Sequence, residues 1–378
     1  MKKVLLSALL LLSTSFMFGL TWDYVEDTRT LYIAGNENMP EYASIEETPW
    51  KEYKKKVDVI TIAEGIETIG SNAFTSFYSL KKVNLPRGIK KIGEKAFAHC
   101  EKLEEIELPQ SLIEINKRAF ESCYNLKSLT VPSKVVNIDD RAFVGCHSLT
   151  ELALESGLER IGEYAFCGTS ITSVYIPSTV KVIEQRAFDG CYSLTSVTIG
   201  SGVKSIGDYA FGGTPLTSVF IPGNVNTIGK GAFIDCTELT SVKIDSGVKV
   251  IGDECFSGNV NLKLLRLGEG LKTIGEKAFA DCKKINSLII PGTVITIGEG
   301  AFKWCTGIES IVIGNGVESI GKVAFKWCTN LESLILGKNL KHIGKGAFSL
   351  CPKLKAVKIP SSVEIIGSGA FSLGCKVM

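Results

Sequence analysis

Cysteine and histidine are the side chains of this chain best suited to bind a metal or to act as a nucleophile. The 378 residues include twelve cysteines and three histidines. Nine of the cysteines lie at one position of a repeated pattern, three residues after a phenylalanine: Cys100, Cys123, Cys146, Cys191, Cys236, Cys282, Cys305, Cys328 and Cys351. Zinc sites need cysteines and histidines clustered at short spacings, and no Cys-x-x-Cys pair occurs. We therefore expect no bound metal and no cofactor.

Twelve cysteines also raise the question of disulfide bonds. If the repeat places one cysteine on each turn of a stack, neighbouring thiols lie about 4.8 Å apart, which is close enough for a bridge. Parallel side chains in the same rotamer, however, seldom reach the dihedral near ±90° that a disulfide requires. Buried free thiols behave as small hydrophobic side chains. We expect the nine cysteines to be reduced and buried, with disulfides between turns as the alternative.

The three histidines do not form a catalytic arrangement. His99 and His147 lie at the corner that follows a repeated phenylalanine, and His342 directly precedes a repeated isoleucine. None of them stands where a serine or cysteine nucleophile and an orienting carboxylate converge. No phosphate-binding loop or dinucleotide fingerprint interrupts the repeat. The sequence therefore predicts a protein that is not an enzyme.

One repeated pattern positions these side chains. The phrase Ile-Gly-x-x-Ala-Phe recurs with small variations, and eleven of the thirteen intervals between its phenylalanines are 23 residues, while two are 22. These phenylalanines are Phe74, Phe97, Phe120, Phe143, Phe166, Phe188, Phe211, Phe233, Phe256, Phe279, Phe302, Phe325, Phe348 and Phe371. A fixed period of this length predicts a solenoid, in which each turn buries its apolar side chains against its neighbours. We expect the phenylalanines to stack in its interior.

Each turn contains one segment with the pattern of a strand. Leu216–Pro222 reads Leu-x-x-Val-x-Ile-Pro, and its alternating apolar residues indicate a short strand with proline at its end. We expect about fourteen such strands in one parallel sheet. The residue after the repeated isoleucine is glycine in eleven turns, which indicates a positive φ or a tight corner.

The outward-facing residues of these strands are free to bind a partner, because they have no role in the core. Contiguous exposed apolar surface usually marks an interface, although β-branched residues also favour strands for their own sake. Two aromatic residues and an apolar run bordered by basic residues stand out at these positions. The predicted protein-binding face consists of Tyr175, Phe220, Arg266, Ile289, Val312, Ile335 and Lys358.

The N-terminal residues differ from the repeat. Residues 1–19 resemble a secretory signal peptide, with Lys2 and Lys3 before a short apolar run. Residues 20–56 predict a β-hairpin around 26–28 and serve as an N-terminal cap, and residues 57–378 form the solenoid. No later stretch approaches the ~20 apolar residues that a transmembrane helix requires. We therefore expect a secreted or cell-surface protein.

Charge is distributed unevenly along the chain. The formal net charge is only +2, so nothing in the composition calls for nucleic acid as a partner. Residues 300–378 hold ten lysines and four glutamates and carry +6, against −4 for the remainder. No C-terminal cap follows the last repeat, and the strand near Lys355–Ile359 is expected to be an edge able to pair with a second copy.

The repeat unit Leu-x-x-Val-x-Ile-Pro-x-x-Val-x-x-Ile-Gly-x-x-Ala-Phe-x-x-Cys resembles the BspA-like leucine-rich repeats, also called the Treponema pallidum type. The segment from Leu20 to Trp50 is similar to the region that precedes those repeats. This resemblance implies an α/β-type repeat solenoid, a leucine-rich-repeat horseshoe with a parallel sheet of about fourteen short strands behind a small β-hairpin cap. It also implies an adhesin that binds host matrix proteins, host cell surfaces or other microbes. The alternative is a structural surface protein that assembles through its uncapped C-terminal end.

Overall fold

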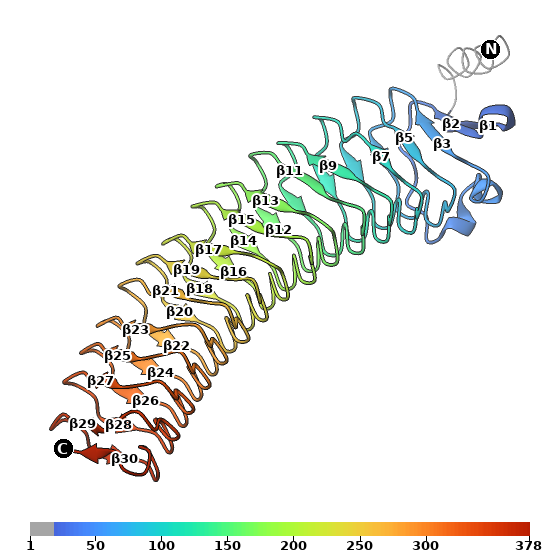
Figure 1. The fold of residues 1–378 in the computed structure, drawn as a ribbon. Helices are drawn as coiled ribbons and strands as arrows, with labels where there is room; N and C mark the ends of the chain where they lie inside the picture. Colours follow the sequence, from blue (N-terminus) through green and yellow to red (C-terminus); the bar gives the residue numbers. More distant parts are fainter. Residues whose placement is uncertain (1–18) are drawn as a thin grey trace. The chain divides into compact units, whose positions relative to one another are not determined.

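The structure, a computed structural model, describes residues 19–378 and is built from short β-strands joined by turns (Figure 1). Within that range the only helical segments are three short 3-10 turns, η1 (Glu26–Thr28), η2 (Ile45–Glu47) and η3 (Lys51–Tyr53). No helix of residues 19–378 has the length and apolar character needed to span a bilayer. The predicted signal peptide lies outside the described residues, apart from its last residue.

The chain divides into two compact units, of which the first ends at Val180. Each turn contributes two strands, which we call the face strand, from the Leu-x-x-Val-x-Ile segment, and the Ile strand, which ends at the repeated isoleucine. The face strands of the first unit are β3 (Val59–Ile62), β5 (Lys82–Asn84), β7 (Glu105–Ile106), β9 (Ser128–Val131), β11 (Glu151–Leu154) and β13 (Ser173–Ile176). Its Ile strands are β4 (Thr68–Ile69), β6 (Lys91–Ile92), β8 (Glu114–Ile115), β10 (Asn137–Ile138) and β12 (Arg160–Ile161).

The second unit, from Lys181 onward, repeats this plan. Its face strands are β15 (Ser196–Ile199), β17 (Ser218–Ile221), β19 (Ser241–Ile244), β21 (Leu264–Arg266), β23 (Ser287–Ile290), β25 (Ser310–Ile313), β27 (Ser333–Ile335) and β29 (Ala356–Val357). Its Ile strands are β14 (Val182–Ile183), β16 (Ser205–Ile206), β18 (Thr227–Ile228), β20 (Val250–Ile251), β22 (Thr273–Ile274), β24 (Thr296–Ile297), β26 (Ser319–Ile320), β28 (His342–Ile343) and β30 (Ile365–Ile366). All the repeat strands that pair within this unit do so in parallel.

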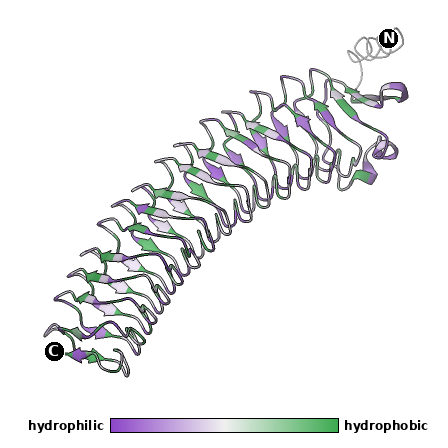
Figure 2. Ribbon diagram, in the orientation of Figure 1, coloured by the Kyte–Doolittle hydropathy of each residue, from purple (hydrophilic) through white to green (hydrophobic). Residues whose placement is uncertain are grey.

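The predicted fold class is confirmed, but the face strands form several short parallel sheets rather than the one expected, and the fourteen-stranded parallel sheet is made of the Ile strands. All fourteen predicted face strands are present, and they pair in parallel wherever they pair within a unit. The Ile strands form a second parallel ladder that the sequence did not predict, because two residues are too few to show an alternation. No repeat turn within residues 19–378 contains an α-helix. Hydrophobic residues recur in every turn (Figure 2).

The repeated phenylalanines form stacked columns inside each unit, as predicted. In the second unit adjacent rings from Phe188 to Phe371 lie 5.1 to 5.4 Å apart between centroids. The backbone joins the turns at the same place, since the Phe302 N–H donates to the Ala324 carbonyl at 2.7 Å. Thirteen of the fourteen phenylalanines are fully buried, and Phe371 is only half-buried because no turn covers its outer side. Each ring therefore depends on the turns before and after it.

The glycine after the repeated isoleucine does not have a positive φ, so that expectation was wrong, whereas its placement in a tight corner holds. A Cβ on Gly298 would lie 2.6 Å from the carbonyl carbon of Gly275 in the previous turn. The close approach of successive turns therefore favours glycine, although Asn116, Asp139 and Glu184 hold the same position in three turns. The left-handed residues of the repeat are instead two before each phenylalanine and two after each one except Phe371, for example Gly300 (φ 60°) and Trp304 (φ 62°).

The N-terminal hairpin covers the first turn. β1 (Thr21–Val25) pairs antiparallel with β2 (Thr30–Ala34), which pairs in parallel with β3. Trp50 is fully buried and stacks on Phe74 with 5.5 Å between ring centroids. Its indole N–H donates to the Ala73 carbonyl at 2.7 Å. Trp50 thus extends the phenylalanine column into the cap and shields the first ring from water.

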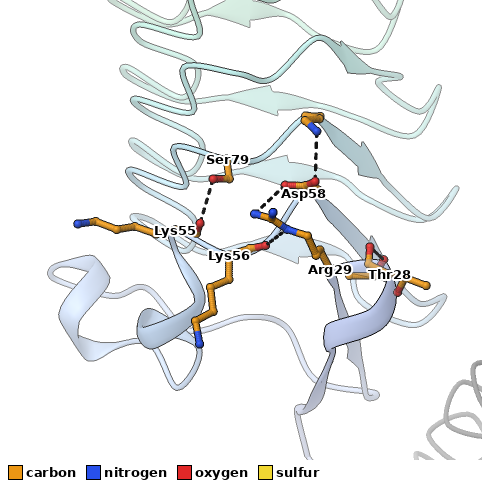
Figure 3. Close-up of polar contacts among 8 residues, drawn as sticks. Thr28, Arg29, Lys55, Lys56, Asp58 and Ser79 are labelled. Atoms are coloured by element: carbon orange, nitrogen blue, oxygen red, sulfur yellow. Dashed lines mark hydrogen bonds and ion pairs between the residues drawn. The ribbon is translucent and has the colours of Figure 1, made fainter.

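Polar contacts bind the hairpin turn to the first repeat (Figure 3). The Arg29 Nε donates to the Lys56 carbonyl at 2.7 Å, and its guanidinium lies 3.2 Å from the Asp58 carboxylate. Lys81 reaches the same carboxylate at 3.2 Å, and the Ser79 hydroxyl donates to the Lys55 carbonyl at 2.9 Å. Because these ion pairs are partly exposed, each contributes no more than about 1 kcal/mol. Their role is to orient the cap on the repeat.

The predicted free edge near Lys355–Ile359 is occupied, so that expectation was wrong. The last residues turn back and add β31 (Lys376–Val377) in parallel to β29. The Ile359 N–H donates to the Met378 carbonyl at 2.8 Å, and the Met378 N–H donates to the Val357 carbonyl at 2.9 Å. These residues carry no repeat signature, which is why the pattern did not reveal the pairing.

Candidate protein-binding surface

Three apolar side chains lie next to one another on the outer side of β23, β25 and β27. Ile289 pairs with Val312, and Val312 pairs with Ile335, in the ladder register. Their side chains are 69%, 37% and 58% exposed. The flanking residues of the same strands point inward and are buried, because successive side chains of a strand alternate between its two sides. We call Ile289, Val312 and Ile335 the apolar stripe.

Lysines lie at one end of the apolar stripe. Lys338 and Lys358 share a shallow hollow of about 360 Å³ with Ile335 and Pro360. Both lysines are exposed, and within residues 19–378 neither takes part in an ion pair. Lys358 was predicted at this border, whereas Lys338 was missed. Lys338 belongs to the turn that follows the strand, outside the outward columns from which the binding face was predicted.

Arg266 was predicted at the other border, but the structure places it in a different sheet. It lies on β21, opposite Lys243 of β19, in the three-stranded sheet β17-β19-β21. In the same sheet Lys243 pairs with Phe220, and its ammonium lies 5.0 Å from the centre of the Phe220 ring. This distance is typical of a cation–π contact. Phe220 is 46% exposed, so this sheet presents an aromatic residue among cations.

Tyr175 lies on β13 of the first unit and is 59% exposed. All seven residues of the predicted face are therefore exposed. The structure groups them into the apolar stripe with Lys358, the sheet containing Phe220 and Arg266, and Tyr175 on the first unit.

The cysteines of the repeat position recur from turn to turn in the interior, and no disulfide joins any cysteine within residues 19–378. All nine cysteines of the repeat position are buried. In eight of them the thiol donates a hydrogen bond to the backbone carbonyl of a phenylalanine in the previous turn, as Cys305 does to Phe279 at 3.1 Å. The same position holds Thr214, whose hydroxyl donates to Phe211, and Asn259, whose amide donates to Phe233 and Phe256.

In most turns this position therefore combines a small side chain with a buried hydrogen-bond donor, whereas the first turn places Phe77 there against Phe74. Burial raises the pKa of Cys146 to about 12 and that of Cys236 to about 11. Such thiols stay protonated near neutral pH and are poor nucleophiles, because the thiolate is the reactive form. The sequence predicted the burial of these cysteines but missed their donor role, which the Thr and Asn replacements could have indicated.

The histidines lie apart from one another. His147 stacks on Tyr124 with 5.3 Å between ring centroids, and its Nδ1 lies 2.8 Å from the Gly168 carbonyl oxygen. His99 is exposed at a left-handed corner, and His342 is half-buried on β28. In the described part of the chain no three His, Cys, Asp or Glu side chains are grouped so as to hold a metal ion. The surface features that suggest a function are the apolar and aromatic patches.

Comparisons with known proteins agree with this geometry. The family described as the BspA type leucine rich repeat region matches residues 45–169, 159–286 and 272–377. A leucine-rich repeat protein from Bacteroides ovatus is 28% identical, with a TM-score of 0.76, and the match covers 96% of this chain and 98% of that one.

Two further solved structures are similar over most of their length. A leucine-rich cell surface protein from Faecalibacterium prausnitzii is 29% identical, with a TM-score of 0.48 over 84% of this chain and 93% of that one. A leucine-rich repeat protein from Eubacterium ventriosum is 24% identical, with a TM-score of 0.44 over 95% and 94%. No curated protein matches the chain.

Proposed function

Because the chain belongs to the BspA-type leucine-rich-repeat family, we propose that it is a secreted or cell-surface protein that binds other proteins, as an adhesin does. Its partners are extracellular proteins of a host or of other microbes, and neither nucleic acid nor a cofactor takes part. The solenoid supports this role, since it lines up outward side chains that have no duty in the core. We assign no catalytic activity to it.

The apolar stripe is the observation that carries the proposal. Three β-branched side chains on hydrogen-bonded strands are exposed at an outward repeat position that holds a polar residue such as Lys243 or Thr198 in other turns. Burying one such side chain contributes about 1.5–3 kcal/mol, so the stripe is costly in water and favourable in an interface. It spans roughly 10 Å across three strands at the usual spacing. This width suits the central anchor of a protein interface.

The lysines beside the stripe give the interface a direction. Lys338 and Lys358 lie together at the Ile335 end. Positive charge at the rim speeds the encounter with an acidic surface and sets its orientation, but adds little affinity once it is exposed to water. A partner with an apolar patch next to acidic residues therefore fits this face.

The proposal is tested by capturing a panel of purified extracellular-matrix and serum proteins on the immobilised full chain. The variant Ile289→Glu with Ile335→Glu should change the free energy of unfolding by no more than ~0.5 kcal/mol, because both positions are exposed. It should abolish capture, because it places two charges in the apolar contact. The matched control is Thr130→Glu with Ala153→Glu, since these residues occupy the same outward column and pair in register on β9 and β11. Capture that survives the stripe variant would move the site elsewhere.

A second candidate function is self-assembly into a surface layer. It rests on exposed apolar residues of β30, where Ile365 and Ile366 are 57% and 46% exposed, and of β31, where Val377 is 49% exposed. Such residues could be covered by a second copy of the chain. Light scattering over a hundredfold range of concentration tests this function, because self-assembly requires the mass to rise with concentration and a strict monomer would exclude it.

A further inference from the structure

A second unusual surface lies at the corner that follows each repeated phenylalanine. Two residues after Phe302, Phe325 and Phe348 the backbone is left-handed, as it is at the same corner of ten other turns. Residues with a Cβ are disfavoured in this conformation. The ten other turns place a small or polar residue or a histidine there: Ser76, His99, Ser122, Gly145, Gly168, Gly190, Gly213, Asp235, Gly258 and Asp281.

Three consecutive turns of the second unit break this rule with large apolar residues. Trp304, Trp327 and Leu350 have φ of 62°, 69° and 60°. Their side chains are 40%, 39% and 43% exposed, so they do not fill the core. Neither backbone preference nor core packing favours these residues at this corner. Strained residues of this kind persist where they serve binding or catalysis. We call Trp304, Trp327 and Leu350 the corner row.

The corner row is contiguous across its turns. The Trp304 N–H donates to the carbonyl of Lys326 in the next turn at 2.9 Å, and the Trp327 N–H donates to the carbonyl of Ser349 at 3.1 Å. Trp327 and Leu350 line a hollow of about 420 Å³ together with Pro352, Phe371 and Leu373. That volume is within the range of ligand-binding clefts, and it has room for one or two large side chains.

The charges around the corner row are mainly positive. The Lys303 ammonium lies 3.9 Å from the centre of the Trp304 ring. The Lys355 ammonium donates to the carbonyl of Pro352, at the wall of the hollow, at 2.8 Å. The carboxylate of Glu332, which follows Trp327 in the same turn, is neutralised by Lys353 at 3.2 Å. An occupant with carboxylates beside an apolar side chain complements these charges.

We propose that the corner row with its hollow is a second binding site, which takes an acidic peptide segment of a partner protein with one large apolar side chain. The apolar side chain enters the hollow beside Trp327, and the flanking carboxylates meet Lys303 and Lys355. A concave, mostly apolar hollow fits an inserted side chain better than it fits a lipid surface, which binds protruding residues. This site differs from the apolar stripe, because it lies on the turns rather than on the face strands.

The test selects peptides from a random phage-displayed library on the immobilised full chain. The comparison variant is Trp304→Ser with Trp327→Ser, since serine occupies the same left-handed corner at Ser76 and Ser122. Enriched peptides should carry aspartate or glutamate next to a large apolar residue. A synthetic peptide of the enriched sequence should bind the variant at least tenfold more weakly. The melting temperature of the variant should not fall below that of the original chain.

Two controls distinguish peptide binding at the corner row from binding at the apolar stripe. The stripe variant Ile289→Glu with Ile335→Glu should keep full peptide affinity, so failure at one site leaves the other standing. Replacing the peptide carboxylates with amides should weaken binding at least fivefold. Absence of enrichment, or equal binding to the tryptophan variant, would overturn the proposal. Tryptophan-dependent binding of phosphatidylserine vesicles without peptide enrichment would assign the corner row to membranes instead.

Discussion

The stability of the solenoid should depend most on the interior of its phenylalanine column. Phe302 is fully buried and lies 5.1 Å from Phe279 and 5.2 Å from Phe325 between ring centroids, with nearly parallel planes. Replacing a buried phenylalanine with alanine leaves a cavity and typically costs about 3–5 kcal/mol of unfolding free energy. Two stacked pairs, each worth about 0.5–1.5 kcal/mol beyond burial, place Phe302→Ala toward the upper end of that range.

Phe371→Ala is the matched control. Phe371 has the same position in the repeat but only one stacked neighbour, Phe348 at 5.4 Å, and is half-buried. We expect its loss to cost about 1–2 kcal/mol, since less apolar area is buried and one stacked pair is removed instead of two.

Urea unfolding followed by both far-ultraviolet circular dichroism and tryptophan fluorescence measures the two effects. Two probes are needed because a solenoid can unfold turn by turn rather than in one step. Tryptophan fluorescence reports the cap, which holds Trp22 and Trp50, and the turns near Trp304 and Trp327, whereas circular dichroism reports the whole chain. If the losses of unfolding free energy in Phe302→Ala and Phe371→Ala differ by less than about 1 kcal/mol, the interior rings are not stabilised by neighbours on both sides, and the reasoning is refuted.

Three further predictions concern other parts of the molecule. Burial raises the pKa of Cys146 to about 12, so folding favours its protonated form, and the free energy of unfolding should be constant below the ordinary thiol pKa of about 8.5 and fall as pH rises above it. Alkylation of the folded protein at pH 8 should label none of the nine cysteines of the repeat position, and labelling would contradict their burial. Gly298→Ala should destabilise by more than about 2 kcal/mol, since its Cβ would meet the backbone of Gly275, while Gly292→Ala, with no atom within 4 Å, should cost less than about 0.5 kcal/mol in the same urea titration. The rate of partner association with the apolar stripe should fall as salt rises from 0.05 to about 0.5 M if Lys338 and Lys358 steer the encounter, and a rate independent of salt would exclude that role.

The repeat made much of the fold predictable. The period of 23 residues indicated the fourteen face strands and the buried phenylalanines, because every turn meets the same neighbours and so selects the same residue types. The outward positions were also predicted, since the alternation of a strand determines which side chains leave the core. Ile289, Val312 and Ile335 are accordingly exposed in adjacent register.

Features that depend on the distance between turns could not be predicted in this way. The sequence left open whether Gly298 needs a positive φ or a tight corner, because its constraint comes from Gly275 in another turn. The break in the hydrogen-bonded ladder between β21, which carries Arg266, and β23 also left no mark in the repeat. Lys338 joins the surface only because its turn folds beside Lys358.

The sequence by itself determined the solenoid and the identity of its outward residues, because a regular hydrophobic period reports burial directly. Only the tertiary structure decided which of those residues lie side by side, which carbonyls the buried thiols meet, and how β31 closes the edge of β29. The physical reason is that these contacts join residues about one repeat apart in sequence and use backbone carbonyl and N–H groups, which carry no side-chain signature.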